Sequence, residues 1–76
     1  MADLADVKDY VFYTAGAQFV NHRGFTQQAE AAKDRWLADR MHELATEYPH
    51  WDRDQRRERA ERNFDAAVRE VEEEGP

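Results

Sequence analysis

The sequence predicts an all-α fold, a small antiparallel bundle of three helices that forms a single domain over residues 1–76. Three observations favour this fold class. Apolar side chains recur every three or four residues in three separate segments, which is the spacing of amphipathic helices. Glycine and proline separate those segments, as they do between helices. Cysteine is absent, so helix packing rather than disulfides or cysteine-bound zinc must hold the chain together.

The first helix is predicted over about residues 3–20, with Asp3 as its N-cap. Its apolar stripe consists of Leu4, Val7, Val11, Ala15 and Phe19. A strand over Val7–Thr14 is the competing interpretation, because Tyr10 to Thr14 form a β-prone run. The helical spacing extends beyond this run and favours the helix, although the sequence alone leaves both possibilities open.

The second helix is predicted over about residues 26–47. Gly24 suits the left-handed position that ends a preceding helix, and Thr26 is a suitable N-cap for the next one. The residue before a proline avoids the α region, so Tyr48 and Pro49 should end the helix. Its apolar face consists of Ala29, Ala32, Trp36, Leu37, Met41, Leu44 and Tyr48.

The third helix is predicted over about residues 52–73. Asp52 and Gln55 have the spacing of a capping box. The apolar stripe that follows consists of Ala60, Phe64, Ala67, Val68 and Val71. Residues 74–76 are expected to form a frayed tail.

Large apolar side chains are scarce, and many of them belong to the first helix. Leu, Val and Phe together number 12, Ile is absent, and Ala alone contributes another 12. In the first helix Tyr10, Phe12 and Tyr13 point away from the stripe, so this helix is apolar nearly all round and must be covered on more than one side. We therefore expect association through the first helix, with a homodimer as the simplest case. The side chains expected in this contact are Tyr10, Phe12, Tyr13 and Phe19.

The charge balance limits the partners. Seventeen acidic and 11 basic residues give a net charge of −6, which repels nucleic acid and anionic lipid at long range. The N-terminus lacks the features of a signal peptide, and no apolar run approaches the roughly 20 residues that span a bilayer. We expect a cytoplasmic protein that neither enters membranes nor has nucleic acid as its main partner.

Five arginines are concentrated between residues 53 and 62, among four acidic residues at 52–61. The spacings Asp52–Arg56, Glu58–Arg62 and Arg57–Glu61 are those of ion pairs along an exposed helix. The same cluster offers an electrostatic contact for a partner. The residues expected in that contact are Arg56, Arg59 and Arg62.

The sequence offers little for catalysis. Ser and Cys are absent, the Thr and Lys residues lie in ordinary settings, and no glycine-rich phosphate loop is present. Asp39 and His42 lie one helical turn apart, but a di-iron bundle needs that pairing twice. We predict no catalytic residue, no metal site and no cofactor.

These observations predict a non-enzymatic, acidic helical module for protein–protein interaction, which self-associates and binds a protein partner. Three alternatives remain open. The first is a nucleic-acid-binding regulator that uses the arginine-rich start of the third helix. The second is a phage-type acidic inhibitor whose rows of carboxylates imitate nucleic acid. The third is the small subunit of a larger enzyme.

Overall fold

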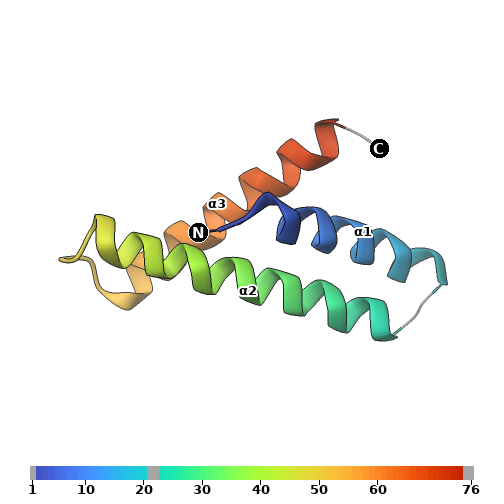
Figure 1. The fold of residues 1–76 in the computed structure, drawn as a ribbon, viewed down its shortest axis with the longest axis horizontal. Helices are drawn as coiled ribbons and strands as arrows, with labels where there is room; N and C mark the ends of the chain where they lie inside the picture. The colour runs from blue at the N-terminus through green and yellow to red at the C-terminus, as the bar shows by residue number, and fades with distance from the viewer. Residues whose placement is uncertain (1, 21–22, 75–76) are drawn as a thin grey trace.

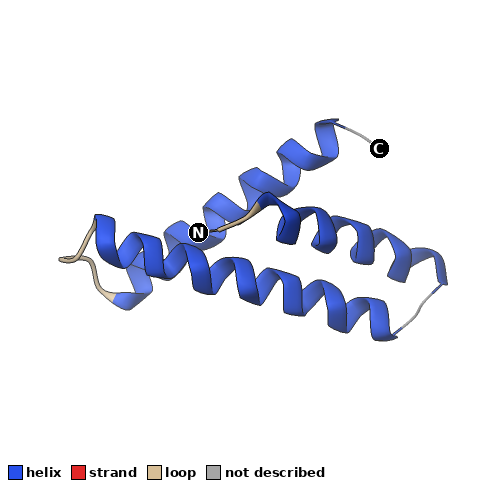
Figure 2. Cartoon of the chain, viewed as in Figure 1, coloured by secondary structure: helices blue, strands red, loops and turns tan. Residues whose placement is uncertain are grey.

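The computed structural model describes residues 2–20 and 23–74, apart from the side chains of Phe19 and Val20. It contains three helices, α1 (Leu4–Val20), α2 (Arg23–Glu47) and α3 (Arg53–Glu74) (Figure 1). All regular structure in the described residues is helical (Figure 2), which confirms the predicted all-α bundle. The segment Val7–Thr14 is helical, so the competing strand is excluded.

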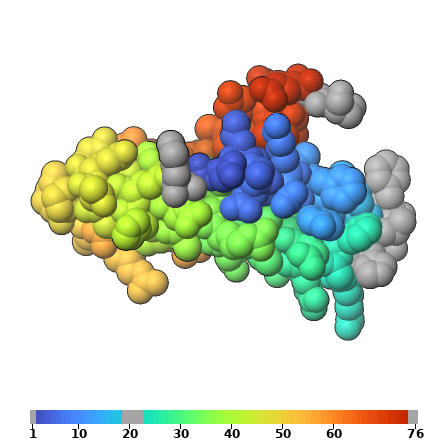
Figure 3. All heavy atoms as spheres, viewed as in Figure 1, coloured from blue at the N-terminus to red at the C-terminus, as the bar shows by residue number. Residues whose placement is uncertain are grey.

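The three helices form an antiparallel pair and a third helix that crosses it. α1 lies along the N-terminal half of α2, and these two helices share the most extensive contact of the three pairs. α3 starts beneath the C-terminal end of α2, crosses the pair and then diverges from it (Figure 1). In the space-filling view α1 lies between α2 and the projecting C-terminal half of α3 (Figure 3). The result is an elongated molecule of 44 × 25 × 17 Å.

Two of the predicted helix caps are confirmed. The backbone N–H of Ala5 donates to Asp3 Oδ1 at 3.0 Å, which caps α1. At the start of α3, the N–H of Gln55 donates to Asp52 Oδ1 at 2.8 Å, and the N–H of Asp52 donates to Gln55 Oε1 at 3.0 Å. This reciprocal pair is the predicted capping box.

The predicted start of the second helix is wrong. α2 begins at Arg23, so Gly24 and Thr26 lie inside the helix and serve neither as a left-handed stop nor as an N-cap. The reason is tertiary: Phe25 packs against Gly16 and Tyr13 of α1, and this contact holds the first turn of α2 in the helix. The third helix also includes Glu74, so the predicted frayed tail does not begin at residue 74, while residues 75–76 lie outside the described part.

α2 ends where Pro49 was expected to end it. The N–H of Tyr48 still donates to the carbonyl oxygen of Leu44 at 2.8 Å, and the N–H of Trp51 then donates to the carbonyl oxygen of Tyr48 at 3.1 Å. The rings of Tyr48 and Trp51 stack, with centroids 4.1 Å apart and planes 7° from parallel. This turn directs the chain back into α3.

The core lies where the three helices cross, and Phe64 is its centre. Phe64 is 2% exposed. The Tyr10 ring of α1 meets it edge-on at a centroid distance of 4.9 Å, and the Trp36 ring of α2 meets it at 5.5 Å. Other buried core residues are Val7, Leu37, Leu44 and Ala60. One phenyl ring on α3 therefore contacts both other helices.

A polar network links the N-terminus of α1 to the other helices beside this core. Glu43 accepts a hydrogen bond from the N–H of Ala2 at 2.7 Å and one from Arg40 at 3.0 Å, while Arg40 Nε donates to Asn63 Oδ1 at 3.0 Å. The Ala2 N–H first, and then Arg40, lower the pKa of Glu43. Because the folded pKa is depressed, this contact stabilises the fold at neutral pH and is lost as the pH falls through that lowered pKa.

Replacing the central ring should destabilise the fold strongly. We expect Phe64→Ala to lower the free energy of unfolding by about 3–5 kcal/mol, because the lost burial adds to the cost of a cavity. Phe12→Ala removes the same atoms from a ring that is 67% exposed, and should cost about 0.5 kcal/mol or less. Urea unfolding followed by circular dichroism measures both. Equal effects of the two substitutions would contradict the assignment of Phe64 as the centre of the core.

Candidate protein-binding surface

A group of three rings lies toward the end of the α1–α2 pair where α1 ends and α2 begins, and we call Phe12, Tyr13 and Phe25 the aromatic surface. Phe12 is 67% exposed and meets the half-buried Tyr13 ring edge-on, with centroids 5.3 Å apart. The Tyr13 ring also contacts the Phe25 ring of α2, with centroids 5.7 Å apart. The three rings form a continuous surface that is joined to both helices.

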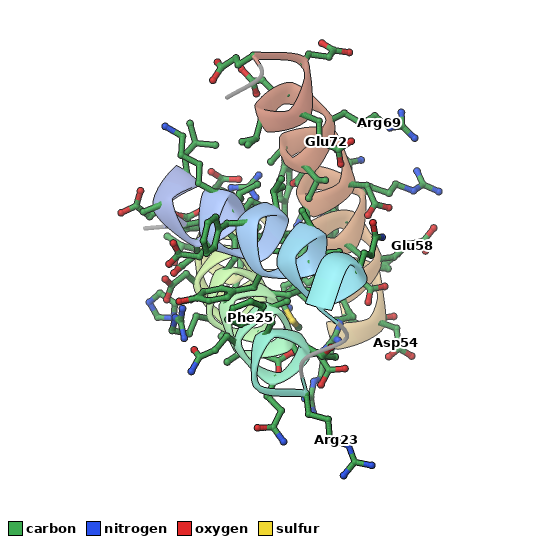
Figure 4. The ribbon with its side chains drawn as sticks, turned by 90° about the vertical axis from the view of Figure 1, so that its right-hand side faces the viewer. Arg23, Phe25, Asp54, Glu58, Arg69 and Glu72 are labelled. Atoms are coloured by element: carbon green, nitrogen blue, oxygen red, sulfur yellow. The ribbon has the colours of Figure 1, made fainter. Side chains whose placement is uncertain are left out.

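Gly16 determines how this surface is built. A Cβ atom added at Gly16 would lie 2.8 Å from Cδ2 of Phe25, which is closer than real Cβ contacts. The missing side chain therefore provides the space in which the Phe25 ring lies, between α1 and α2 (Figure 4). Phe25 in turn supports Tyr13, and Tyr13 supports the exposed ring of Phe12.

Tyr10 is not part of the aromatic surface, although the sequence grouped it with Phe12 and Tyr13. It is half-buried, and its ring packs on Phe64 in the core. α3 crosses on the side of α1 that carries Tyr10, and this covers one of the faces that the first helix was expected to leave open. The side chain of Phe19, the fourth predicted contact residue, lies outside the described residues.

Two open pockets lie beside Tyr10, one between α1 and α2 and the other between α1 and α3. Tyr10, Thr14 and Gln18 line both of them. The first is also lined by Ala17, Thr26, Ala29 and Glu30, and the second by Val11, Ala15 and Glu72. Neither pocket was expected from the sequence, although the small residues spaced by three in α1 and in α2 are a signal that could have indicated the first.

The predicted arginine contact lies at the other end of the molecule. Arg56 donates a hydrogen bond to the carbonyl oxygen of Trp51, and the Arg59 guanidinium lies 5.5 Å from the centre of the Trp51 ring. Arg62 forms an ion pair with Glu58 at 2.8 Å. Arg56 thus stabilises the turn before α3, whereas Arg59 and Arg62 line an open recess beside Trp51.

The structure therefore separates the two groups of predicted contact residues. The aromatic surface lies toward the end of the pair where α1 ends and α2 begins, and the arginines lie at the start of α3 near the opposite end of the long axis (Figure 1). Of the predicted pairs along α3, Glu58–Arg62 and Arg57–Glu61 are present at 2.8 and 3.4 Å. Exposed pairs of this kind contribute little to stability.

The described residues provide neither a metal-binding cluster nor a membrane-spanning helix. Over residues 2–20 and 23–74, no three His, Asp or Glu side chains are grouped so that they could hold a metal ion. In this same part of the chain, no helix combines the length and the apolar character needed to cross a membrane. No protein-family model, curated protein or solved structure matches the chain.

A double-mutant cycle tests how the aromatic surface is built. In a helix interior Gly→Ala normally stabilises by about 1 kcal/mol. We expect Gly16→Ala in the wild-type chain to raise the free energy of unfolding by clearly less than this, because the new Cβ displaces the Phe25 ring. In a Phe25→Ala background the same substitution should give the full increase. Urea unfolding of the four proteins gives the coupling free energy. The same effect of Gly16→Ala in both backgrounds would contradict the packing of Phe25 on Gly16.

Proposed function

We propose that this chain is a small, non-enzymatic protein-interaction module of the cytoplasm, which self-associates and binds a protein partner. One observation carries the proposal. A chain with only 12 Leu, Val and Phe residues leaves Phe12 67% exposed, on top of rings that hold it in place. Aromatic side chains are enriched at the centres of protein interfaces, where their burial contributes much of the binding energy.

The apolar contact extends along the outer face of α1. Leu4, which the sequence spacing placed in the apolar stripe of the first helix, is instead 48% exposed and lies two turns before Phe12, with Lys8 between them at four-residue spacing. Ala15 is exposed one turn beyond Phe12. A partner helix laid along this face would bury Leu4 and Phe12 together and would have to place an acidic or polar side chain opposite Lys8, which lies between them.

The support beneath Phe12 favours binding for a second reason. Binding costs free energy when a mobile side chain becomes fixed. The edge-on contact with Tyr13, itself supported by Phe25, already restricts the Phe12 ring in the unbound chain. A partner therefore gains the burial of the ring at a reduced entropic cost.

The arginines are the proposed electrostatic part of the contact, but they are not equally available to a partner. Arg59 and Arg62 remain exposed and suit an acidic partner, whereas Arg56 is engaged with the Trp51 carbonyl. Four acidic residues lie among these arginines and the net charge is −6, which weighs against phosphate binding because that depends on uncompensated positive charge. We therefore rank the interaction module above the nucleic-acid-binding regulator.

Photo-crosslinking from position 12 tests the proposal. We expect a chain with benzoylphenylalanine in place of Phe12 to form a covalent adduct of defined mass, with a second copy in the purified protein or with another protein in an extract of the native source. The same probe in place of Ala38, which is exposed on α2, is the matched control. Excess wild-type chain should compete for the adduct, whereas excess Phe12→Ser chain should not. An adduct yield at position 12 no greater than at position 38 would contradict the proposed surface.

A further inference from the structure

The outer face of α3 carries a symmetric row of charges. Its members are spaced by three, four, four and three residues, so they lie on one side of the helix, and all of them are exposed. From the N-terminal to the C-terminal end the row has two bases, one alanine and two acids. We call it the α3 stripe, and it consists of Arg59, Arg62, Ala66, Glu70 and Glu73.

The α3 stripe lies opposite the face that packs in the core. Ala60 and Phe64 are buried and Val68 and Val71 are half-buried, and these four residues lie on the other side of the helix. Figure 4 shows Glu58 and Arg69, which border the stripe, pointing away from α1 and α2. Within the described residues, neither α1 nor α2 covers the stripe.

The order of charges makes the stripe complementary to itself. When a second α3 lies antiparallel to the first, with the two Ala66 residues facing each other, Arg62 lies opposite Glu70 of the partner subunit. In the same register Arg59 lies opposite Glu73 of the partner subunit. Two-fold symmetry repeats both pairs, so four ion pairs form around a small central residue that allows the two helices to approach closely. A parallel arrangement in register would place like charges opposite each other.

The charges of the stripe are available for such a contact. Among the described residues, Glu70 and Glu73 take part in no ion pair. Arg62 pairs with Glu58, but the two side chains are 72% and 67% exposed, so this pair contributes little and leaves other N–H donors of Arg62 in solvent. Arg59 is held near the helix surface by the Trp51 ring.

α1 is less suited to a contact between two copies. A two-fold contact along its outer face that pairs Leu4 with Phe12 of the partner subunit would place Lys8 against Lys8 of the partner subunit. Like charges facing each other destabilise an interface. The outer face of α1 therefore fits a different protein better than a second copy.

We propose that the second copy of this chain binds antiparallel along the α3 stripe, and that the aromatic surface stays open for a different protein. This inference rests on the self-association included in the proposed function. It replaces the first helix by the third as the contact between copies.

Charge-reversal variants, whose self-association is measured by sedimentation equilibrium, test the proposal. We expect Arg59→Glu/Arg62→Glu and Glu70→Arg/Glu73→Arg each to weaken self-association at least tenfold. The combined four substitutions, which keep the net charge of −6, should restore it, and the two double variants should associate with each other when mixed. An effect of net charge alone would instead strengthen association in Glu70→Arg/Glu73→Arg, which is less negative. Circular dichroism checks that every variant keeps its helical content.

A disulfide-crosslinking experiment locates the two-fold axis of the proposed dimer. The chain has no cysteine, so Ala66→Cys introduces a single thiol. We expect mild oxidation to link Ala66→Cys into a dimer, because two residues facing each other on closely packed helices can reach the Cα separation of about 4.4–6.8 Å that a disulfide needs. Ala15→Cys, which is exposed on α1, and Ala38→Cys, which is exposed on α2, are the matched controls and should remain monomeric.

The outcomes separate the two proposals. A wild-type chain that stays monomeric up to millimolar concentration would overturn both this inference and the self-association of the proposed function. The α3 contact alone would be overturned by a different result: the wild-type chain dimerises, the Ala15→Cys variant rather than the Ala66→Cys variant forms the disulfide-linked dimer, and the charge reversals do not weaken association. Restoration by the combined variant together with crosslinking at Ala66→Cys would establish the α3 contact.

Discussion

The fold depends on one buried ring. Phe64 is the place where α3 contacts α1 through Tyr10 and α2 through Trp36, and the buried residues Val7, Leu37 and Leu44 belong to the same core. A chain with so few large apolar residues can fill one such crossing but not a bundle of full length. α3 is therefore tied to the pair near its middle and diverges from it beyond.

Local contacts stabilise the parts that the core does not reach. At one end the Asp52–Gln55 capping box and the stacked rings of Tyr48 and Trp51 fix the turn into α3. At the other end Phe25 fits against Gly16 and holds the first turn of α2 on α1. Phe25 also supports the Tyr13 ring, on which the exposed Phe12 ring packs, so the contact that joins α1 to α2 also positions the proposed binding surface.

Much of the fold could be predicted from the sequence, because helical spacing and caps such as Asp3 and Asp52 are local signals. Contacts between distant residues could not. Gly24 and Thr26 have the local chemistry of a helix boundary, but the packing of Phe25 on α1 extends the helix through them. Tyr10 belongs to the core only because α3 crosses on its side of α1, and the periodicity of one helix does not reveal where another will cross. Likewise, composition predicts that the chain has more aromatic rings than its core can bury. Only the packing of the three helices shows that Tyr10 is in the core and that Phe12 is exposed.

The central claim is that stability is concentrated where the helices cross and declines along each helix away from that point. Amide hydrogen exchange of the purified chain, followed residue by residue by NMR, tests it most directly. The slowest exchange is predicted near Tyr10, in α2 between Trp36 and Leu44, and around Phe64. Within the same continuous helix, the amides of α1 beyond Tyr13 should exchange markedly faster. Uniform protection along α1, or the slowest exchange at its C-terminal half, would contradict the account.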